Sequence, residues 1–294
     1  MSILGNRVLR VEDPKFLTTG GVYADDLSFE GALWVTYVRS TSAHARIAGI
    51  DTSDALGMPG VVAVYTGEDV DLLPLPPGMP GVPAQMARPT LAKGTVRFVG
   101  EAVAAILTEE RYQGEDAAEA VLVDYEPLPA VVDAEAALAG DVLLFPEVGS
   151  NVGANFEEPL DEGFFDGCEV VVRQRVINQR VAPCPLEVRA GAASWGADGR
   201  LTQWASNQSP HGSKEAIAGL YGLDPEQVRV VIPDVGGGFG AKIGLYAEDM
   251  LLGWLARRAG RPVRWTETRT ESMVSLGHGR AQIQDIALGG TREG

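Results

Sequence analysis

Short segments of alternating hydrophobic and polar residues dominate the first half of the chain and predict β-strands. Residues 31–51 are extended and partly alternating, and residues 60–70 form a second strand ending in a turn. Residues 72–89 contain too much proline and glycine for either element and are predicted as a surface loop. A buried strand is expected within 96–110, and a helix followed by a strand within 111–126. This order of elements predicts an α+β module.

One side of the predicted helix carries Tyr112, Ala117, Ala120 and Val121. After that module, residues 133–162 are acidic and loop-like. We interpret them as a linker between two parts of the chain.

The second half begins with further strand patterns. Residues 168–183 alternate like a pair of strands, and residues 191–208 predict a hairpin that turns at Ala197-Asp198-Gly199. A helix is expected over 213–223, capped by a serine and stopped by Gly222.

A β-branched strand at 228–235 runs into a glycine-rich turn, VGGGFGAK, and a helix is predicted after it at 245–258. Another strand is expected at 262–269. The buried stripe of the helix is predicted to contain Met250, Leu251, Trp254 and Leu255.

The glycine turn departs from one phosphate-binding motif and matches another. A P-loop requires Gly-Lys-Ser/Thr, and Ala241-Lys242-Ile243 lacks the hydroxyl that ligates magnesium. The dinucleotide pattern G-x-G-x-x-G/A does match, as Gly236, Gly238 and Ala241, with Glu267 as a candidate ribose-binding acid. Such a pattern alone is weak evidence, so a tight turn without a ligand and a site for another cofactor stay open.

Composition excludes several classes of protein. The 294 residues carry a formal charge of −16, which argues against binding nucleic acid or anionic membranes. Two cysteines, Cys168 and Cys184, support neither a disulfide framework nor a four-ligand zinc site, and we interpret them as buried thiols. Three scattered histidines, His44, His211 and His278, disfavour a histidine-rich metal site. Because no signal peptide or membrane-spanning run is recognisable, we expect a cytoplasmic protein.

Several segments together resemble one enzyme family. The turn VGGGFGAK is similar to the molybdopterin-contacting loop of the xanthine dehydrogenase / aldehyde oxidase / carbon monoxide dehydrogenase family, in its molybdenum-binding large subunit. RVEDPKFLTTGGVYADDL, YVRSTSAHARI, VRFVGEAVAAI, SNQSPHGSK and GRPVRWTETRTESM resemble further segments of that subunit, in the same order. The resemblance covers essentially the whole chain. It implies a mixed α+β and α/β fold, with an α/β hammerhead domain at 1–145 and the first part of a molybdopterin-binding domain at 146–294.

The resemblance also implies which residues approach the cofactor. Gly237, Gly238, Phe239 and Gly240 match the loop whose N–H groups face the molybdenum and the pterin, and Gln208 matches a glutamine that hydrogen-bonds an oxo ligand. Glycines suit this role because no Cβ blocks the cofactor. Phe239 would cover one side of the metal and limit the access of water; a core anchor is the alternative. No residue of this chain is expected to ligate the metal directly.

Positions that differ from the family pattern limit the expected substrate and the roles expected of neighbouring residues. Ile243 stands where xanthine-oxidising members carry a glutamate, which disfavours a purine substrate and favours a carbon monoxide- or aldehyde-type one. Lys242 is explained equally well as a solvated or helix-capping lysine. Glu187 and Arg189 are interpreted as a structural salt-bridge or turn pair and not as catalytic groups.

The implied reaction oxidises a small substrate with water-derived oxygen at a molybdopterin centre, with the cytosine dinucleotide as one form of the cofactor. Electrons would pass to iron–sulfur clusters and FAD on partner chains, an iron–sulfur subunit and an FAD-binding subunit. The family's general-base glutamate is expected beyond Gly294, so no catalytic residue is assigned within the chain. We expect the chain to be a gene fragment, a frameshifted product or one piece of a split subunit, completed by a missing C-terminal part and inactive alone.

Two alternatives remain. One is a non-catalytic fragment or assembly module that folds without holding a cofactor. The other is a nicotinamide-dependent dehydrogenase that uses the G-x-G-x-x-A turn.

Overall fold

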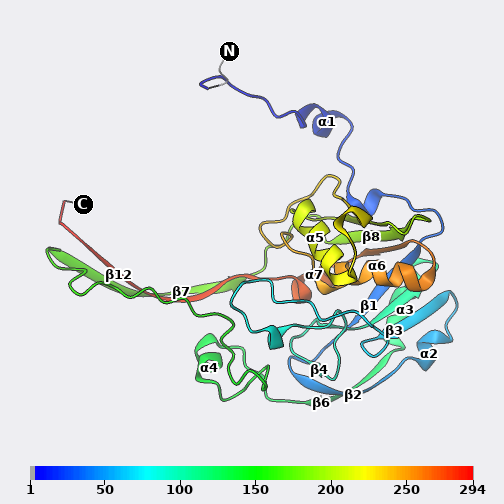
Figure 1. Cartoon of the computed structure of the whole chain (residues 1–294), viewed down its shortest axis with the longest axis horizontal. Coiled ribbons are helices and arrows are strands. Elements are labelled where there is room, and N and C mark those ends of the chain that lie inside the picture. Colours follow the sequence, from blue (N-terminus) through cyan, green and yellow to red (C-terminus); the bar gives the residue numbers. More distant parts are fainter. Residues whose placement is uncertain (1–3, 294) are drawn as a thin grey trace.

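A mixed seven-stranded sheet combines strands from both halves of the chain (Figure 1). The computed structural model describes residues 4–293. In sheet order, the strands are β10 (Val228–Val231), β9 (Leu201–Ala205), β8 (Ala190–Trp195), β11 (Val263–Thr266), β1 (Leu33–Arg39), β5 (Ala102–Thr108) and β3 (Val61–Thr66). β1 pairs in parallel with β11, with Leu33 opposite Val263, and β9 pairs in parallel with β10. The other neighbouring pairs are antiparallel.

The structure also contains two smaller sheets besides the seven-stranded sheet and the helices packed on it, which together form the body of the molecule. One consists of β4 (Thr95–Val96), β2 (Ala45–Asp51) and β6 (Leu122–Pro127). The other pairs β7 (Val170–Val181) with β12 (Gly279–Gly290) as a long antiparallel arm that extends away from the body (Figure 1).

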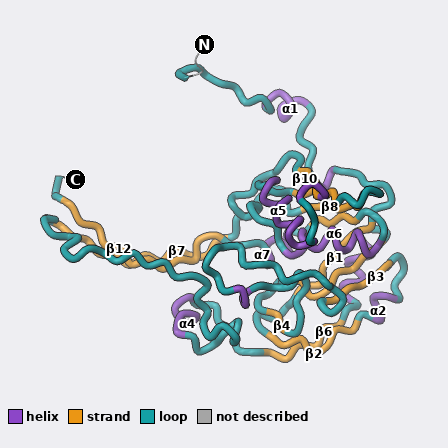
Figure 2. Tube along the Cα trace, in the orientation of Figure 1, coloured by secondary structure: helices purple, strands orange, loops and turns teal. Residues whose placement is uncertain are grey.

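The helices are short and mostly lie on the faces of the large sheet (Figure 2). The α-helices are α1 (Asp13–Thr18), α2 (Ser53–Leu56), α3 (Arg111–Glu119), α4 (Ala134–Ala139), α5 (Pro210–Tyr221), α6 (Ala247–Ala259) and α7 (Arg269–Ser275). The 3₁₀ turns are η1 (Ala24–Asp26), η2 (Ala84–Met86) and η3 (Pro225–Gln227). Within the described part of the chain, none of the helices is long and apolar enough to cross a membrane.

Alternate residues of the central strands point to two different cores, as the two-residue period of a strand requires. Leu33, Val35 and Tyr37 of β1 pack in one cluster with Leu251 and Leu255 of α6. This cluster therefore joins the first and second halves of the chain. It is dry: all five side chains are buried.

The opposite face of β5 packs against elements of the first half only. Ile106 lies in a cluster with Ala55 of α2, Ala117 of α3 and Val121. Our expectation of a helix in this region is confirmed, but Tyr112 does not share its buried side and is 66% exposed. The buried positions of α3 are Gly114 and Ala117.

The hydrophobic core of the first half is not entirely its own. One face of β1 and β5 would be exposed to solvent if α6 of the second half did not cover it. The shared sheet shows that the two halves are continuous in their packing. The mixed α/β architecture is confirmed. The limits 1–145 and 146–294 stay a prediction.

Local predictions in the second half are mostly confirmed. β8 and β9 form the expected hairpin, α5 ends at Gly222 in the left-handed conformation, and α6 buries its predicted stripe. The predicted strand pair at 168–183 is wrong, because these residues form the single strand β7, whose partner is the distant β12. The linker at 133–162 is also not purely irregular: Asp133 caps α4 by accepting a hydrogen bond from the Ala136 amide.

Candidate functional site

The glycine turn at 236–240 lies after β10 and before α6, at one end of the shared sheet. Its backbone is left-handed at Gly237 (φ +98°), Phe239 (φ +53°) and Gly240 (φ +86°). Glycine adopts such angles without a steric penalty, whereas a phenylalanine there is strained by about 1 kcal/mol. Strain of this kind concentrates at functional sites, so Phe239 marks the turn as more than a connection.

Four consecutive main-chain donors of the turn are free. Within residues 4–293, nothing accepts a hydrogen bond from the N–H groups of Gly237, Gly238, Phe239 or Gly240. The amides on either side are used: Gly236 donates to the carboxylate of Glu187, and the Ala241 amide to the carbonyl of Gly238. Successive unpaired N–H groups in a left-handed turn form a concave site for anions and electron-rich oxygens.

Gln208 lies directly against this turn, as the sequence predicts for a shared site. Its Oε1 accepts a hydrogen bond from the backbone N–H of Lys242 at 3.2 Å, and its backbone N–H donates to the Lys242 carbonyl at 2.8 Å. The side-chain nitrogen of Gln208 is bonded to nothing in the part of the chain that the structure describes. A Cβ placed on Gly238 would fall 2.2 Å from Gln208 Oε1, so glycine is required for this contact.

Phe239 is 75% exposed and is not a core anchor. Its ring lies over Gly237, where an added Cβ would come 3.2 Å from ring atom Cε2. A large apolar side chain held in the open beside free donors can exclude water from whatever binds there.

Lys242 is neither solvated nor a helix cap, which corrects both structural interpretations of that residue. Its side chain is 1% exposed, and its Nζ lies 3.0 Å from Glu187 Oε2 and 2.7 Å from Ser206 Oγ. Burial lowers the pKa of Lys242, and the hydrogen bond and negative charge of Glu187 oppose that shift. Glu187 therefore pairs with Lys242 and not with Arg189. The sequence carried no signal for this pairing, because the two residues are far apart along the chain.

Arg189 forms a separate buried ion network behind the turn. Its guanidinium contacts Glu267 at 2.7 Å and Glu248 at 3.3 Å, and Glu248 also pairs with Arg39 of β1 at 2.6 Å. Burial alone would raise the pKa of Glu248, but the positive charges of Arg189 and Arg39 lower it to about 2. The carboxylate of Glu267 is fully buried in this network and is not available to a ribose.

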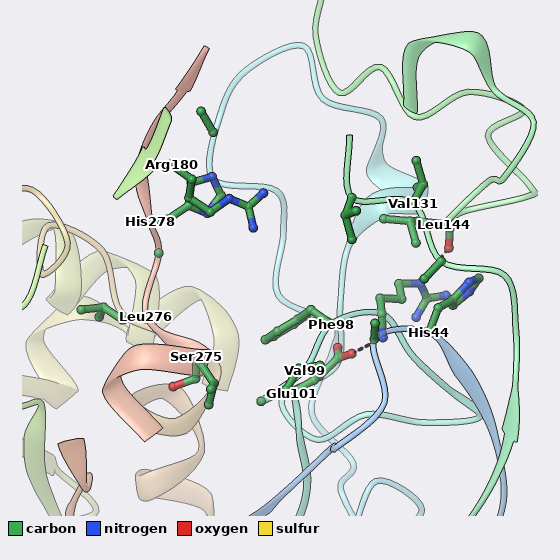
Figure 3. A pocket seen from close by; sticks show the side chains of 18 of the residues that line it. His44, Phe98, Val99, Glu101, Val131, Leu144, Arg180, Ser275, Leu276 and His278 are labelled. Atoms are coloured by element: carbon green, nitrogen blue, oxygen red, sulfur yellow. Dashed lines mark hydrogen bonds between the residues drawn. The ribbon is translucent and has the colours of Figure 1, made fainter. Parts of the chain in front are cut away.

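A cavity of about 1000 Å³ lies apart from the glycine turn, between segments of the first half of the chain and the base of the β7–β12 arm (Figure 3). Arg180 and His278 lie on one side of it and His44 on the other. Burial, and then the charge of Arg180, lower the pKa of His278. Sequence reasoning did not identify this cavity, since its walls come from segments far apart in the chain.

Tyr246 contacts both the cavity and the residue that follows the turn. Tyr246 lines the cavity, donates from its hydroxyl to the Ala241 carbonyl at 2.8 Å, and accepts from the Gly277 amide at 3.0 Å. None of the predicted site residues lines the cavity. We therefore centre the candidate site on the donors of the turn.

Metal-ligating side chains do not gather in the described residues: no group of three or more His, Cys, Asp or Glu there is placed to hold a metal ion. Both cysteines are free thiols. Cys168 is half-buried, and Cys184 is exposed, which corrects our interpretation of two buried thiols. Any metal at this site would have to arrive within a cofactor held by other groups.

Two family descriptions match the chain and together cover most of it. Residues 18–129 match "Aldehyde oxidase and xanthine dehydrogenase, a/b hammerhead domain", and residues 144–294 match "Molybdopterin cofactor-binding domain". Sequence relatives include the nicotine 6-hydroxylase large subunit of Paenarthrobacter nicotinovorans, 36% identical over all of this chain and 37% of its own length. The carbon monoxide dehydrogenase large chain of Hydrogenophaga pseudoflava is 35% identical over 98% of this chain and 38% of its own.

Solved structures agree in fold. The quinoline 2-oxidoreductase of Pseudomonas putida 86 superposes with a TM-score of 0.91 at 37% identity, over 99% of this chain and 38% of that one. The chain thus spans less than two fifths of the length of these relatives. The shared fold, the buried Glu267 and these matches overturn the nicotinamide-dependent alternative. The chain belongs to the xanthine dehydrogenase / aldehyde oxidase / carbon monoxide dehydrogenase family and corresponds to the N-terminal portion of its molybdenum-binding large subunit.

Proposed function

We propose that the glycine turn and Gln208 form one wall of a molybdopterin site in a molybdenum hydroxylase. The observation that carries the proposal is a set of five donor nitrogens at one strained turn that bond to nothing within residues 4–293: four main-chain amides and the side-chain nitrogen of Gln208. Molybdopterin and its metal present phosphate and oxo oxygens, which are the acceptors that such donors fit. The residues present therefore suit the group.

Each part of the turn has a distinct task in this proposal. The amides of 237–240 bind electron-rich oxygens without adding a net charge. Gln208 orients one such oxygen from the side, since its carbonyl oxygen is already occupied by the Lys242 amide. In the assembled enzyme, the ring of Phe239, which is exposed in this chain, covers one side of the cofactor and limits the access of water. When bound, the cofactor supplies the two-electron oxidation and the transfer of water-derived oxygen to the substrate.

The substrate we propose is small and uncharged, of carbon monoxide or aldehyde type. Ile243 follows the loop lysine and is exposed beside the turn, so this position offers an apolar side chain and no carboxylate for a purine. A second candidate is a nitrogen heterocycle, favoured by the similarity to a nicotine hydroxylase and a quinoline oxidoreductase. An apolar Ile243 is compatible with both.

We propose that the chain works with an iron–sulfur subunit and an FAD-binding subunit, and with the rest of the large subunit. One relative is named as the gamma subunit of a dehydrogenase complex and another as a large chain, so chains of this kind operate in assemblies. Two separate thiols cannot ligate an iron–sulfur cluster, which normally takes four cysteines. Electron acceptors therefore belong to the partners in this proposal.

The decisive experiment measures cofactor content. The chain would be produced in cells that synthesise molybdopterin, together with a remaining large-subunit part and redox subunits from a relative, and the purified assembly analysed for molybdenum and pterin. We expect near-stoichiometric cofactor in the wild type, and a loss of about ten-fold in Gln208→Ala, corresponding to about 1.4 kcal/mol of weaker binding. Gln174→Ala is the matched control, because Gln174 lies on the exposed arm. An assembly without molybdenum or pterin would favour the alternative of a non-catalytic module.

A further inference from the structure

Glu187 and Lys242 hold the two ends of the glycine turn from beneath. Glu187 lies just before β8, and Lys242 is the last residue of the turn motif. The Lys242 ammonium donates to Glu187 Oε2 at 3.0 Å, to the Glu187 carbonyl at 2.8 Å and to Ser206 Oγ at 2.7 Å. The Val188 carbonyl is a fourth acceptor at 3.4 Å, so the three N–H donors of the ammonium are all engaged.

The carboxylate acts on the other end of the turn. Glu187 Oε2 accepts a hydrogen bond from the Gly236 amide at 2.8 Å and another from Ser206 Oγ at 2.7 Å. A Cβ on Gly236 would lie 2.5 Å from Glu187 Cβ, so the turn is packed directly on this side chain. Glu187 therefore fixes the first residue of the turn as Lys242 fixes its last.

Lys242 also connects the pair to Gln208 through its backbone. The amide and carbonyl of Lys242 make the two hydrogen bonds that hold Gln208, at 3.2 and 2.8 Å. A displacement of Lys242 would thus move the side-chain donor of Gln208 together with the four main-chain donors.

Neither charge has another evident task. Lys242 is too deeply buried to meet a ligand, and Glu187 is largely covered by Lys242, Ser206 and the turn. A buried ion pair often contributes less to stability than an apolar pair of the same volume, so stability alone is a weak reason for its presence. Preorganised donors, by contrast, depend on a rigid support, because misplacement by about 1 Å weakens a site substantially.

We propose that the Glu187–Lys242 ion pair is a positioning element: it clamps both ends of the glycine turn and so sets the donor array of 237–240 and Gln208. The inference rests on the proposed function for what the donors receive. It assigns to the two residues no contact with the cofactor and no step in the chemistry.

The clamp is tested first without any cofactor. In Lys242→Met, hydrogen exchange of the amides of Gly236, Ala241 and Lys242 should accelerate by about ten-fold relative to the wild-type chain, because the bonds that protect them open locally. Amides of α6 should keep their wild-type rates. Lys93→Met is the matched control, since Lys93 forms an exposed pair with Glu68 and neither residue bonds to the turn. Unchanged exchange at the turn in Lys242→Met would overturn the proposal.

Glu187→Gln separates charge from hydrogen bonding and serves if Lys242→Met does not fold. Glutamine keeps an acceptor for the Gly236 amide but removes the negative charge. Its side-chain nitrogen would take the place of Glu187 Oε1, an oxygen that is buried without a hydrogen-bond partner among the described residues. We expect exchange to accelerate at Lys242 and Ala241 more than at Gly236. Acceleration equal at all three amides and throughout α6 would indicate general destabilisation and would contradict a clamp.

Cofactor content in the assembled enzyme completes the test. Lys242→Met should retain about ten-fold less pterin than the wild type, while Lys93→Met retains the wild-type amount. If the wild-type assembly binds no pterin, the proposed function fails, and the exchange data still decide on the clamp. If the wild type binds pterin and Lys242→Met binds as much, the clamp fails and the proposed function stands.

Discussion

Nη2 of Arg189 lies 2.7 Å from Oε2 of Glu267, and water is excluded from both side chains. Arg189 also donates from its backbone amide to Oε1 of Glu267 at 2.8 Å, so the two residues are bonded through main chain and side chain together. The pair joins the start of β8 to the residue after β11, and through Glu248 and Arg39 it reaches β1. It therefore ties together strands from both halves of the chain.

Removing the positive charge of this pair should destabilise the fold strongly. Arg189→Met would leave Glu267 buried without its ion-pair partner and Glu248 with Arg39 alone, and we expect the free energy of unfolding to fall by about 3–5 kcal/mol. Chemical denaturation measures this change. Arg46→Met is the control, because the Arg46–Glu126 pair is exposed and its loss should cost less than about 1 kcal/mol. Similar losses in the two variants would contradict the assigned role of the buried network.

Asp249 should make stability depend on pH in an unusual direction. Burial raises the pKa of Asp249 to about 6; Arg189 opposes this shift, and the charge of Glu248 adds to it. In the unfolded chain this carboxyl titrates near pH 4, so between about pH 4 and about pH 6 only the folded state holds the proton. Protonated Asp249 therefore adds its full amount to the free energy of unfolding below about pH 4, and this stabilisation is lost as the pH rises through about 6.

The difference between the wild type and Asp249→Asn isolates that contribution. The wild type should lose about 2–3 kcal/mol relative to the variant between about pH 4 and about pH 7. The pH dependence of stability due to Glu248 has the opposite sign, because its pKa is lowered to about 2. The stabilisation from Glu248 is lost as the pH falls below the ordinary pKa of a glutamate. A pH-independent difference between the wild type and Asp249→Asn would show that Asp249 does not titrate in this range.

Patterns within a few residues of each other were predictable. The β8–β9 hairpin, the left-handed stop of α5 at Gly222 and the buried stripe of α6 all follow from local turn chemistry and periodicity. The glycine turn was recognisable for the same reason, since a β-branched strand, successive glycines and a helix follow one another directly in the sequence.

Pairings over long distances were not predictable. No periodicity shows that Leu33 lies opposite Val263, or that β7 pairs with β12, because register between distant strands depends on the whole sheet. The burial of Lys242 was missed for a related reason: a lysine is normally exposed unless a distant partner accepts its charge. The sequence therefore predicted the glycine turn but not the buried Glu187–Lys242 ion pair that holds it.

Gly238→Val tests the close contact between the turn and Gln208. The new side chain would collide with the end of the Gln208 side chain, which is exposed and can move, so the loss of stability should be small. The displaced Gln208 could no longer act with the turn, and cofactor content in the assembled enzyme should fall by about ten-fold. Gly244→Val is the matched control, because nothing lies within 4 Å of a Cβ there. Wild-type molybdenum content in Gly238→Val would refute the close-approach interpretation.

The last prediction is that the chain of 294 residues, purified alone, does not hydroxylate an aldehyde, a heterocycle or carbon monoxide. Proton removal from a reacting group requires a positioned base with a suitable pKa. The two carboxylates nearest to that role within the chain are already engaged: Glu187 is paired with Lys242, and the pKa of Glu248 is lowered to about 2 by Arg189 and Arg39, against the effect of burial. Phe239 and Gly240 are also exposed in the isolated chain, so water competes for hydrogen bonds at this end of the turn. Turnover with an artificial electron acceptor would be measured for the isolated chain and for the chain assembled with the remaining large-subunit part and redox subunits, and only the assembly should be active. Molybdenum-dependent turnover by the isolated chain, abolished in Glu187→Gln or Glu248→Gln, would prove this prediction wrong and identify the base among the residues described here.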